Sequence, residues 1–264
     1  MTSANTGSIP GGEPDRIDPV LDGLVVALRS GPGPLTTFLE EHREALPEVW
    51  ALKALSDDPM GDLHKDNFVH TVKVIDQCGE TDDTTLLAAL FHDVGKPTTR
   101  RVDRGQVSFH GHEVVGARLV RRRCKEWGID PEPIVTTIFV AARAQSYDDS
   151  WTDSSVRRIR HDAGDRWDGA IRLAHSDVTS KHAHVHRRVH QAVDALTTRS
   201  DDLLIEDARR AERPVLDGND LAELGVPRGP EMGRLLRWLL EENRAGRLED
   251  PDDARAAITA RRSE

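Results

Sequence analysis

The chain has 264 residues, of which 37% are hydrophobic, 31% charged and 4% aromatic, a balance typical of a soluble globular protein. Its net charge of −10 argues against a surface that coats nucleic acid, because such a surface has to be basic. Two cysteines are too few for a disulfide framework, and no apolar run reaches the roughly 18 residues of a membrane span. We therefore expect a cytoplasmic protein that does not associate with membranes.

The first half of the chain is expected to form short helices. Residues 1–14 are rich in serine, glycine and proline, which predicts a disordered tail. The spacing of apolar residues then predicts helices over 17–28, 35–45, 66–75, 81–90, 113–127 and 132–143. The polar stretch 98–109 is expected to be a loop.

The second half continues the helical pattern. A helix is expected to start after the turn at Trp151–Ser154, and a long helix is predicted over 166–196. A small helical unit begins near 214–220, and its last amphipathic helix covers 231–246. We predict an all-α fold with three parts, namely the tail 1–14, a helical core 15–200 and a C-terminal helical region 201–264.

The dipeptide His92-Asp93 ends an apolar helical run. Imidazoles and carboxylates are ligands for divalent transition metals, and two further ones are available in His70 upstream and Asp177 downstream. Together they offer a nitrogen and oxygen site for Mn, Fe, Co, Ni or Zn, whose bound water could hydrolyse a phosphate ester. A His-Asp pair also occurs by chance in many chains, so the residues alone leave a protein without a metal open.

Lys96 lies one helical turn beyond His92. In a phosphohydrolase it could hold the phosphate or neutralise the charge that develops on it. The alternative is that the ammonium interacts only with the carbonyl end of its own helix.

Several motifs in one order resemble the HD-domain metal-dependent phosphohydrolases. These are His64–Asp66, His70, Leu90–Arg100 and Asp177. The likeness extends to the C-terminal part of bacterial CCA-adding tRNA nucleotidyltransferases over roughly residues 50–250, through Val107–Ala117, Trp151–Arg158, Ser176–Lys181 and Leu216–Asn219. The resemblance implies an HD-domain helical bundle with a small C-terminal helical appendage, and His70, His92, Asp93 and Asp177 as metal ligands.

The chain also departs from that family. No Gly-Ser or Gly-Gly turn precedes paired aspartates, since Gly11-Gly12 stands in the expected tail, so we expect no nucleotide-adding activity. The helix matching residues 138–145 often carries histidines for a second metal in the family, but Ala141 and Gln145 stand here. This departure implies one divalent metal per chain and counts against an HD-type di-iron oxygenase.

Four further residues are candidates for binding the substrate. His110 and His112 could bind phosphate, with His112 as a general acid, or they could simply cap a helix. Arg100 and Arg143 could clamp a phosphate with paired hydrogen bonds, or they could be ordinary surface residues.

Three other features have simpler explanations. His182, His186 and His190 share one helix face and could chelate a metal, but no carboxylate or loop closes such a site, so a solvated face is the favoured explanation. The clusters Arg121–Arg123 and Arg157–Arg158 could supply a local basic groove or merely face solvent. The glycine-rich segment 225–233 could hold a nucleic-acid phosphate before a helix, but a turn is the commoner role.

The sequence therefore predicts a metal-dependent phosphohydrolase in which Asp93, Lys96 and His112 are catalytic and Lys96, Arg100, His110 and Arg143 bind substrate. The expected substrate is a phosphomonoester or cyclic phosphodiester of a nucleotide, an RNA end or a sugar phosphate, with a nucleotide favoured and RNA as a further partner. The alternatives are a non-catalytic tRNA- or nucleotide-binding module, a di-iron oxygenase, and a metal that only ties helices together. The sequence does not indicate an oligomeric state.

Overall fold

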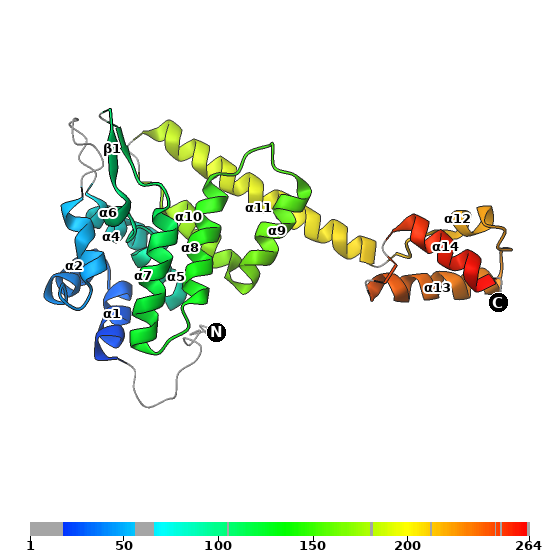
Figure 1. Cartoon of the computed structure of the whole chain (residues 1–264), viewed down its shortest axis with the longest axis horizontal. Helices are drawn as coiled ribbons and strands as arrows, with labels where there is room; N and C mark the ends of the chain where they lie inside the picture. Colours follow the sequence, from blue (N-terminus) through cyan, green and yellow to red (C-terminus); the bar gives the residue numbers. More distant parts are fainter. Residues whose placement is uncertain are drawn as a thin grey trace. The chain divides into compact units, whose positions relative to one another are not determined.

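The computed structural model describes residues 18–55, 66–104, 106–179, 182–211, 213–245, 247–248 and 250–262. The predicted tail 1–14, together with Gly11-Gly12, His64, Lys65 and Lys181, lies outside them. The chain divides into two compact units, Met1–Thr198 and Arg199–Glu264. The predicted all-α fold is confirmed, since helices make up nearly all the regular structure of the described residues (Figure 1).

The first unit contains most of the helices, and the last of them continues past the end of the unit at Thr198. In chain order they are α1 (Pro19–Arg29), α2 (Pro32–Glu41), α3 (Pro47–Trp50), the 3₁₀ turn η1 (Ala51–Ala54), α4 (Asn67–Cys78), α5 (Asp83–Phe91), α6 (Lys96–Thr99), α7 (His112–Trp127), α8 (Glu132–Gln145), α9 (Asp153–Ala163), the 3₁₀ turn η2 (Gly164–Arg166), α10 (Trp167–Ser176) and α11 (Ala183–Ala211). The predicted boundary between residues 200 and 201 falls inside α11.

An aspartate caps the N-terminus of α4, which carries His70, and another caps α5, which leads to His92. The side chain of Asp66 accepts hydrogen bonds from the backbone N–H groups of Phe68 and Val69 at the start of α4. Asp82 accepts one from Thr85 at the start of α5. Such caps satisfy donors that have no partner inside the helix, so they fix where the helix begins.

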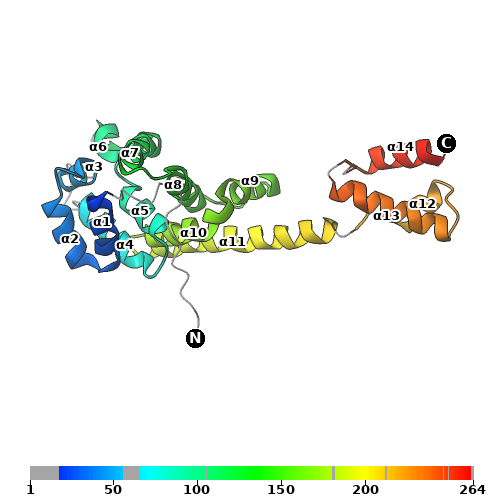
Figure 2. The ribbon, with the colours of Figure 1, turned by 90° about the horizontal axis from the view of Figure 1, so that it is seen from below.

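Helix α5 lies at the centre of the first unit. Its residues Thr85–Phe91 are all buried, because the helix is apolar on every side and α4, α8 and α10 pack around it (Figures 1 and 2). The end of α5 is therefore held inside the unit, and the His92-Asp93 dipeptide that follows is buried as well.

A close approach of two backbones holds α6 against α7. A Cβ atom added at Gly95 would lie 2.0 Å from the backbone oxygen of His112, so only glycine fits there. Gly116 faces Gly95 from the next turn of α7. These two glycines bring His112 close to the end of α5.

Three sequence predictions require correction. The helix predicted over 166–196 is two helices, since α10 ends at Ser176 with Asp177 as its C-cap and α11 begins at Ala183. The stretch predicted as a loop contains a hairpin of β1 (Arg101–Asp103) and β2 (Gln106–Ser108), antiparallel with Val102 opposite Val107. Helix α2 begins at Pro32 rather than at residue 35, because proline suits the first helical turn, where its missing N–H costs nothing.

The second unit is a small helical assembly with its own core. It contains α12 (Gly218–Glu223), α13 (Pro230–Arg244) and α14 (Pro251–Arg262). Leu221, Leu239 and Ile258 are fully buried in its core. Arg262 donates to the backbone oxygens of Leu224 and Gly225, which ties α14 to the end of α12. Within the described ranges, no helix combines the length and the apolar character that crossing a bilayer requires.

Candidate metal centre

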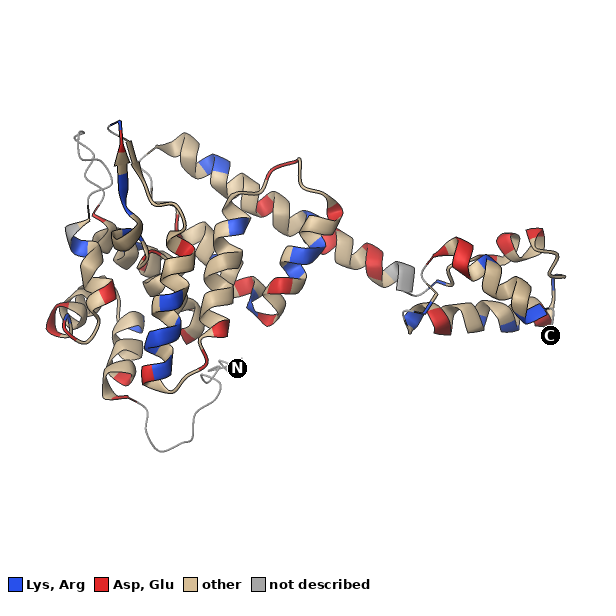
Figure 3. Cartoon of the chain, viewed as in Figure 1, with Lys and Arg blue, Asp and Glu red and all other residues tan. Residues whose placement is uncertain are grey.

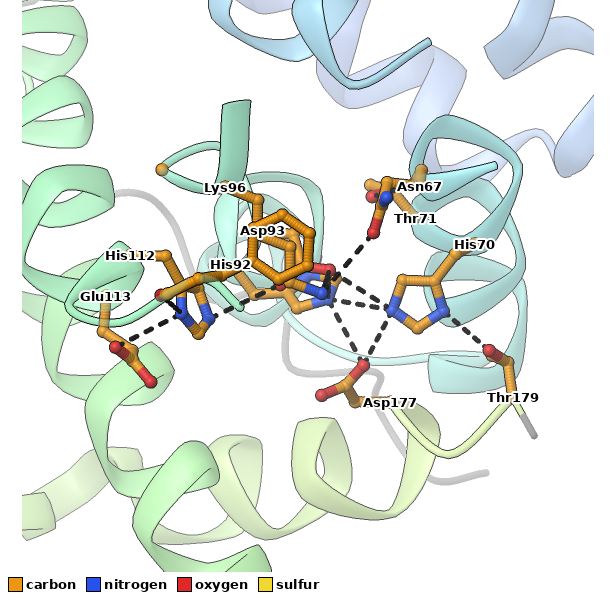
Figure 4. Close-up of polar contacts among 12 residues, drawn as sticks. Asn67, His70, Thr71, His92, Asp93, Lys96, His112, Glu113, Asp177 and Thr179 are labelled. Atoms are coloured by element: carbon orange, nitrogen blue, oxygen red, sulfur yellow. Dashed lines mark hydrogen bonds and ion pairs between the residues drawn. The ribbon is translucent and has the colours of Figure 1, made fainter. Parts of the chain in front are cut away.

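His70 approaches the centre from α4 and is buried. Its Nδ1 lies 2.7 Å from the hydroxyl of Thr179, which fixes the orientation of the ring (Figure 4). Its Nε2 points toward His92, whose Nε2 is 3.2 Å away. Two consecutive helices thus present imidazole nitrogens to the same point.

His92 follows the last turn of α5 and is oriented by that helix. Its Nδ1–H donates to the backbone oxygen of Ala89 at 2.8 Å, since a carbonyl can only accept. The lone pair of the neutral ring is therefore on Nε2, which faces the other site residues. A carbonyl partner on the opposite nitrogen is the usual support for a histidine that ligates a metal.

Asp177 completes a triangle of ligand atoms. Its Oδ1 lies 2.9 Å from Nε2 of His70 and 3.3 Å from Nε2 of His92. The amide of Gln145 on α8 donates to Oδ2 of Asp177 at 3.2 Å and to the backbone oxygen of Ala174 at 2.8 Å. Gln145 therefore holds the second carboxylate oxygen and leaves Oδ1 directed at the two histidines.

Asp93 closes the centre from the side of α6. Its Oδ2 is 3.2 Å from Nε2 of His92, 3.5 Å from Nε2 of His70 and 2.8 Å from the ammonium of Lys96. Despite these close charges, Oδ2 is buried and has no well-aligned hydrogen bond among the described residues. Its close neighbours are two imidazole nitrogens and one ammonium, and a divalent cation would bring further positive charge to the two carboxylates of the centre.

The donor set fits a divalent transition metal. One ligand atom from each of His70, His92 and Asp177 lies within 4.8 Å of the others, and Asp93 stands beside them. Ligands about 2.0–2.2 Å from a single ion are separated by about 3.0–3.5 Å, which agrees with the observed spacing. Two nitrogens and two carboxylates suit Mn, Fe, Co, Ni or Zn rather than Ca or Mg, which prefer all-oxygen sites.

The same proximity shifts the protonation of the site. Burial alone lowers the pKa of His92, but the carboxylates of Asp93 and Asp177 outweigh it and raise that pKa to about 10. Burial alone raises the pKa of Asp93, but His92 and Lys96 hold it well below its ordinary value. The pKa of Asp177 is also lowered, because the nearby imidazoles outweigh its burial. Without a metal, a proton on His92 balances the carboxylates, so a metal has to displace that proton.

A cavity of about 260 Å³ opens on the centre. Its polar wall includes His92, Asp93, Lys96, His112 and Asp177, and its apolar wall includes Ile138, Ala141 and Leu173. A small molecule can therefore reach the candidate metal ligands through this cavity.

His112 faces this cavity from the start of α7. Its Nδ1–H donates to the backbone oxygen of Phe109 at 2.9 Å, so the lone pair is on Nε2. That Nε2 lies 3.8 Å from Oδ1 of Asp93 (Figure 4). The ammonium of Lys96 is also 3.4 Å from Oδ1 of Asn67 and 5.4 Å from the centre of the Phe109 ring.

The other predicted substrate-binding residues lie outside the cavity lining. Arg143 is paired at the surface with Asp162 at 3.2 Å and lies over the ring of Trp151. His110 is exposed in the turn before α7, and Arg100 is half-buried at the end of α6. Their predicted roles remain predictions.

Sequence reasoning missed three residues that support the centre, namely Asn67, Gln145 and Thr179. Gln145 was considered only as a replacement for a possible metal ligand, whereas its amide bonds Asp177. Thr179 stands two positions after Asp177. Once Asp177 is a candidate metal ligand, this short spacing indicates that the hydroxyl of Thr179 could also lie near the centre. Asn67 directly follows the N-cap Asp66, and its position gave no such signal.

The fold and the centre define an α-helical domain with a buried site of two histidines and two aspartates. The chain matches the HD domain family over residues 65–199, which is about half of its length, and it belongs to that family. HD domains bind divalent metals and form a superfamily of metal-dependent phosphohydrolases.

Two curated relatives extend the comparison beyond the domain. The A-adding tRNA nucleotidyltransferase of Deinococcus radiodurans is 30% identical over 223 residues, which cover 81% of this chain and 50% of that protein. The CC-adding tRNA nucleotidyltransferase of Thermus thermophilus is 33% identical over 175 residues, which cover 65% of this chain and 38% of that protein. The chain thus spans half or less of each relative.

Proposed function

We propose that the chain is a metal-dependent phosphohydrolase acting on a phosphomonoester or a cyclic phosphodiester. His70, His92, Asp93 and Asp177 would hold one divalent transition metal. The observation that carries the proposal is the convergence of four ligand groups beside a polar cavity. The Nε2 atoms of His70 and His92 lie 2.9–3.5 Å from carboxylate oxygens of Asp93 and Asp177.

The residues around the cavity suit hydrolysis of a phosphate ester. When bound, a divalent cation supplies Lewis-acid chemistry, because it acidifies water and polarises a phosphoryl oxygen. Lys96 places its ammonium at the cavity wall, where it favours a phosphate and the negative charge that develops during reaction. His112 directs Nε2 into the same space, and as imidazolium it would give a proton to the leaving oxygen.

The cavity size favours a small substrate. A volume of about 260 Å³ lies just below the range of common ligand pockets, about 300–1,000 Å³, which suits a phosphate with part of a nucleotide or a sugar. We therefore propose a nucleotide, a sugar phosphate or the terminal 2′,3′-cyclic phosphate of an RNA. Ala141 on the cavity wall leaves space where a larger side chain would reduce it.

A second candidate function is a tRNA- or nucleotide-binding module without turnover. The likeness to two tRNA nucleotidyltransferases favours it, because it covers most of this chain. The charge distribution offers less support, since acidic and basic residues are interspersed in the described part (Figure 3). Two arginines of the predicted basic cluster on α7 are also engaged, with Arg121 bound to Glu132 and Arg123 bound to Glu48.

Phosphate release separates the two functions. The assay offers nucleoside monophosphates, 2′,3′-cyclic nucleotides, sugar phosphates and RNA with a cyclic end, each with Mn²⁺, Co²⁺, Ni²⁺, Zn²⁺ or Fe²⁺. Asp93→Ala is expected to lose activity and metal together, whereas Asp162→Ala removes an exposed carboxylate that pairs with Arg143 and serves as the control. Release that survives in Asp93→Ala contradicts the proposed mechanism. No release from any compound, with tRNA bound by the native protein, supports the binding module.

A further inference from the structure

A second group of histidines lies away from the candidate metal centre, between α10 and α11. His175 on α10 and His190 on α11 have their Nδ1 atoms 2.7 Å apart. Their rings are nearly parallel, at an interplanar angle of 19° and a centroid separation of 4.8 Å. His175 was not part of the histidine series noted in the sequence, and only the tertiary fold brings it to His190.

The surroundings leave a lone pair on Nδ1 of His175. Its Nε2 lies 3.2 Å from Oδ1 of Asp194, which stands one helical turn after His190. Because a carboxylate accepts, the proton of a neutral His175 belongs on Nε2. Two N–H groups cannot face each other at 2.7 Å, so at least one of the two Nδ1 atoms is unprotonated.

The pattern matches the outer support that metal-ligating histidines usually have. In such sites one ring nitrogen binds the ion, and the other donates to a carboxylate that fixes the tautomer. Asp194 stands in that position toward His175. A third imidazole is close, since His186 stacks on His190 with a centroid separation of 5.7 Å and an angle of 16°.

The spacing and the access both suit a metal. Two nitrogens that bind one ion at about 2.0–2.1 Å at adjacent corners of a square are about 2.9 Å apart, close to the observed 2.7 Å. The His175 side chain is 28% exposed and lines a cavity of about 350 Å³ with Gln77 and Thr197, so water can reach it and fill the remaining positions.

We infer that His175 and His190 form a second transition-metal site, selective for Cu²⁺ or Ni²⁺, with Asp194 orienting His175 and His186 as a nearby third imidazole. Imidazole donors favour these ions, with Cu²⁺ bound most tightly. The site lies within the first unit and joins α11 to the helix that ends at Asp177. When an ion binds, the proton on Nδ1 of His190 moves to Nε2 of the same ring.

The test measures Cu²⁺ binding by untagged protein, since a histidine tag would bind the same ion. The parent protein carries His70→Ala and His92→Ala, so that the candidate centre keeps no imidazole and any nitrogen splitting comes from elsewhere, which makes the result independent of the proposed function. We expect one Cu²⁺ per chain by equilibrium dialysis, with an electron paramagnetic resonance spectrum showing splitting from imidazole nitrogens.

The variants added to this parent are His190→Ala and, as a matched control, His184→Ala, which removes an exposed histidine of the same helix. We expect His190→Ala to weaken Cu²⁺ binding at least tenfold and to lose the nitrogen splitting, and His184→Ala to change neither. Asp194→Asn is expected to weaken binding about tenfold, the lower end of the effect of losing an outer partner.

Two results would overturn the inference, namely a parent that binds no Cu²⁺ and a His190→Ala variant that binds it like the parent. If the parent fails to fold by circular dichroism, native protein replaces it, and the number of Cu²⁺ ions bound per chain is measured for the native protein and for His190→Ala. Loss of one bound Cu²⁺ in His190→Ala supports the site, and an unchanged number contradicts it.

Discussion

The amide of Gln145 donates to Oδ2 of Asp177 at 3.2 Å while it also bonds the backbone of α10. This contact links α8 to the carboxylate that follows α10. It turns Oδ1 of Asp177 toward His70, 2.9 Å away. An uncharged amide at this position supports a ligand and supplies no imidazole of its own.

Gln145→Ala is therefore expected to weaken metal binding without unfolding the protein. The loss of an outer hydrogen bond to a ligand typically costs about 10–100-fold in metal affinity. The dissociation constant for Zn²⁺ or Co²⁺, measured with a competing chelator, checks this. Gln191→Ala on the exposed face of α11 is the control and should match the native protein. Unchanged affinity in Gln145→Ala would mean that Asp177 is held in place without the amide.

Metal binding is expected to strengthen as the pH rises. The pKa of His92 is raised to about 10, so the metal-free site holds a proton at neutral pH, and the ion has to displace it. Affinity should then rise about tenfold per pH unit between pH 6 and 8, with about one proton released per ion. Calorimetry in two buffers of different ionisation enthalpy counts that proton. Binding without proton release would show that His92 is already neutral.

The metal-free protein should lose stability over the alkaline range. A folded-state pKa above the ordinary 6.5 contributes stability that is complete below pH 6.5 and is lost as the pH rises through 10. The lowered pKa values of Asp93 and Asp177 act in the opposite direction, and their contribution is lost in acid. The Tm of chelator-treated protein should therefore fall between pH 7 and 10. If the Tm stays constant over this range and His92→Ala behaves identically, the pKa of His92 is not raised in the folded protein.

His112→Gln is expected to lower kcat while it leaves the bound metal in place. Its Nε2 faces the cavity but lies 3.8 Å from Asp93, so we assign it proton transfer rather than a place among the metal ligands. Loss of a general acid typically lowers the rate about 10²–10⁴-fold. The pH profile of kcat should lose its alkaline limb, which a structural defect would not remove. His161→Ala, at a side chain that is 91% exposed, is the control.

Gly95→Ala should destabilise the fold and displace His112. The added Cβ would lie 2.0 Å from the backbone oxygen of His112 and 2.7 Å from the backbone nitrogen of Gly116, where no flexible side chain can yield. Overpacking of this kind costs about 1–3 kcal/mol, and backbone atoms place this case at the upper end. Urea unfolding measures it. Gly33→Ala in α2 meets nothing within 4 Å and should be neutral or slightly stabilising.

The residues of the centre could be predicted from the sequence, but the contacts that orient them could not. The HD motif indicated His70, His92, Asp93 and Asp177, and the structure brings all four together. The prediction placed Asp177 inside a long helix, because Asp177-Val178-Thr179 contains neither glycine nor proline to mark an end. Leaving the helix at that point brings the hydroxyl of Thr179 to His70, a contact that depends on how α4 and α10 pack.

Several elements were missed, for different physical reasons. The strands β1 and β2 have three residues each, which is too short for an alternation of apolar and polar residues to be recognised in the sequence. Helix α14 could have been predicted. Asp250 accepts hydrogen bonds from the backbone N–H groups of Asp252 and Asp253, and Pro251 occupies the first turn. The pattern of a capping aspartate followed by proline is a helix-start signal that the sequence displayed.

The buried end of α5 and the exposed hairpin β1–β2 differ in how much substitution they can tolerate. His92 and Asp93 follow a helix whose residues Thr85–Phe91 are all buried, so substitutions near them disturb the packing of the whole unit. The hairpin β1–β2 instead exposes most of its side chains and leads directly into the turn before His112. Substitutions in the hairpin are therefore expected to be tolerated more readily than substitutions at the end of α5.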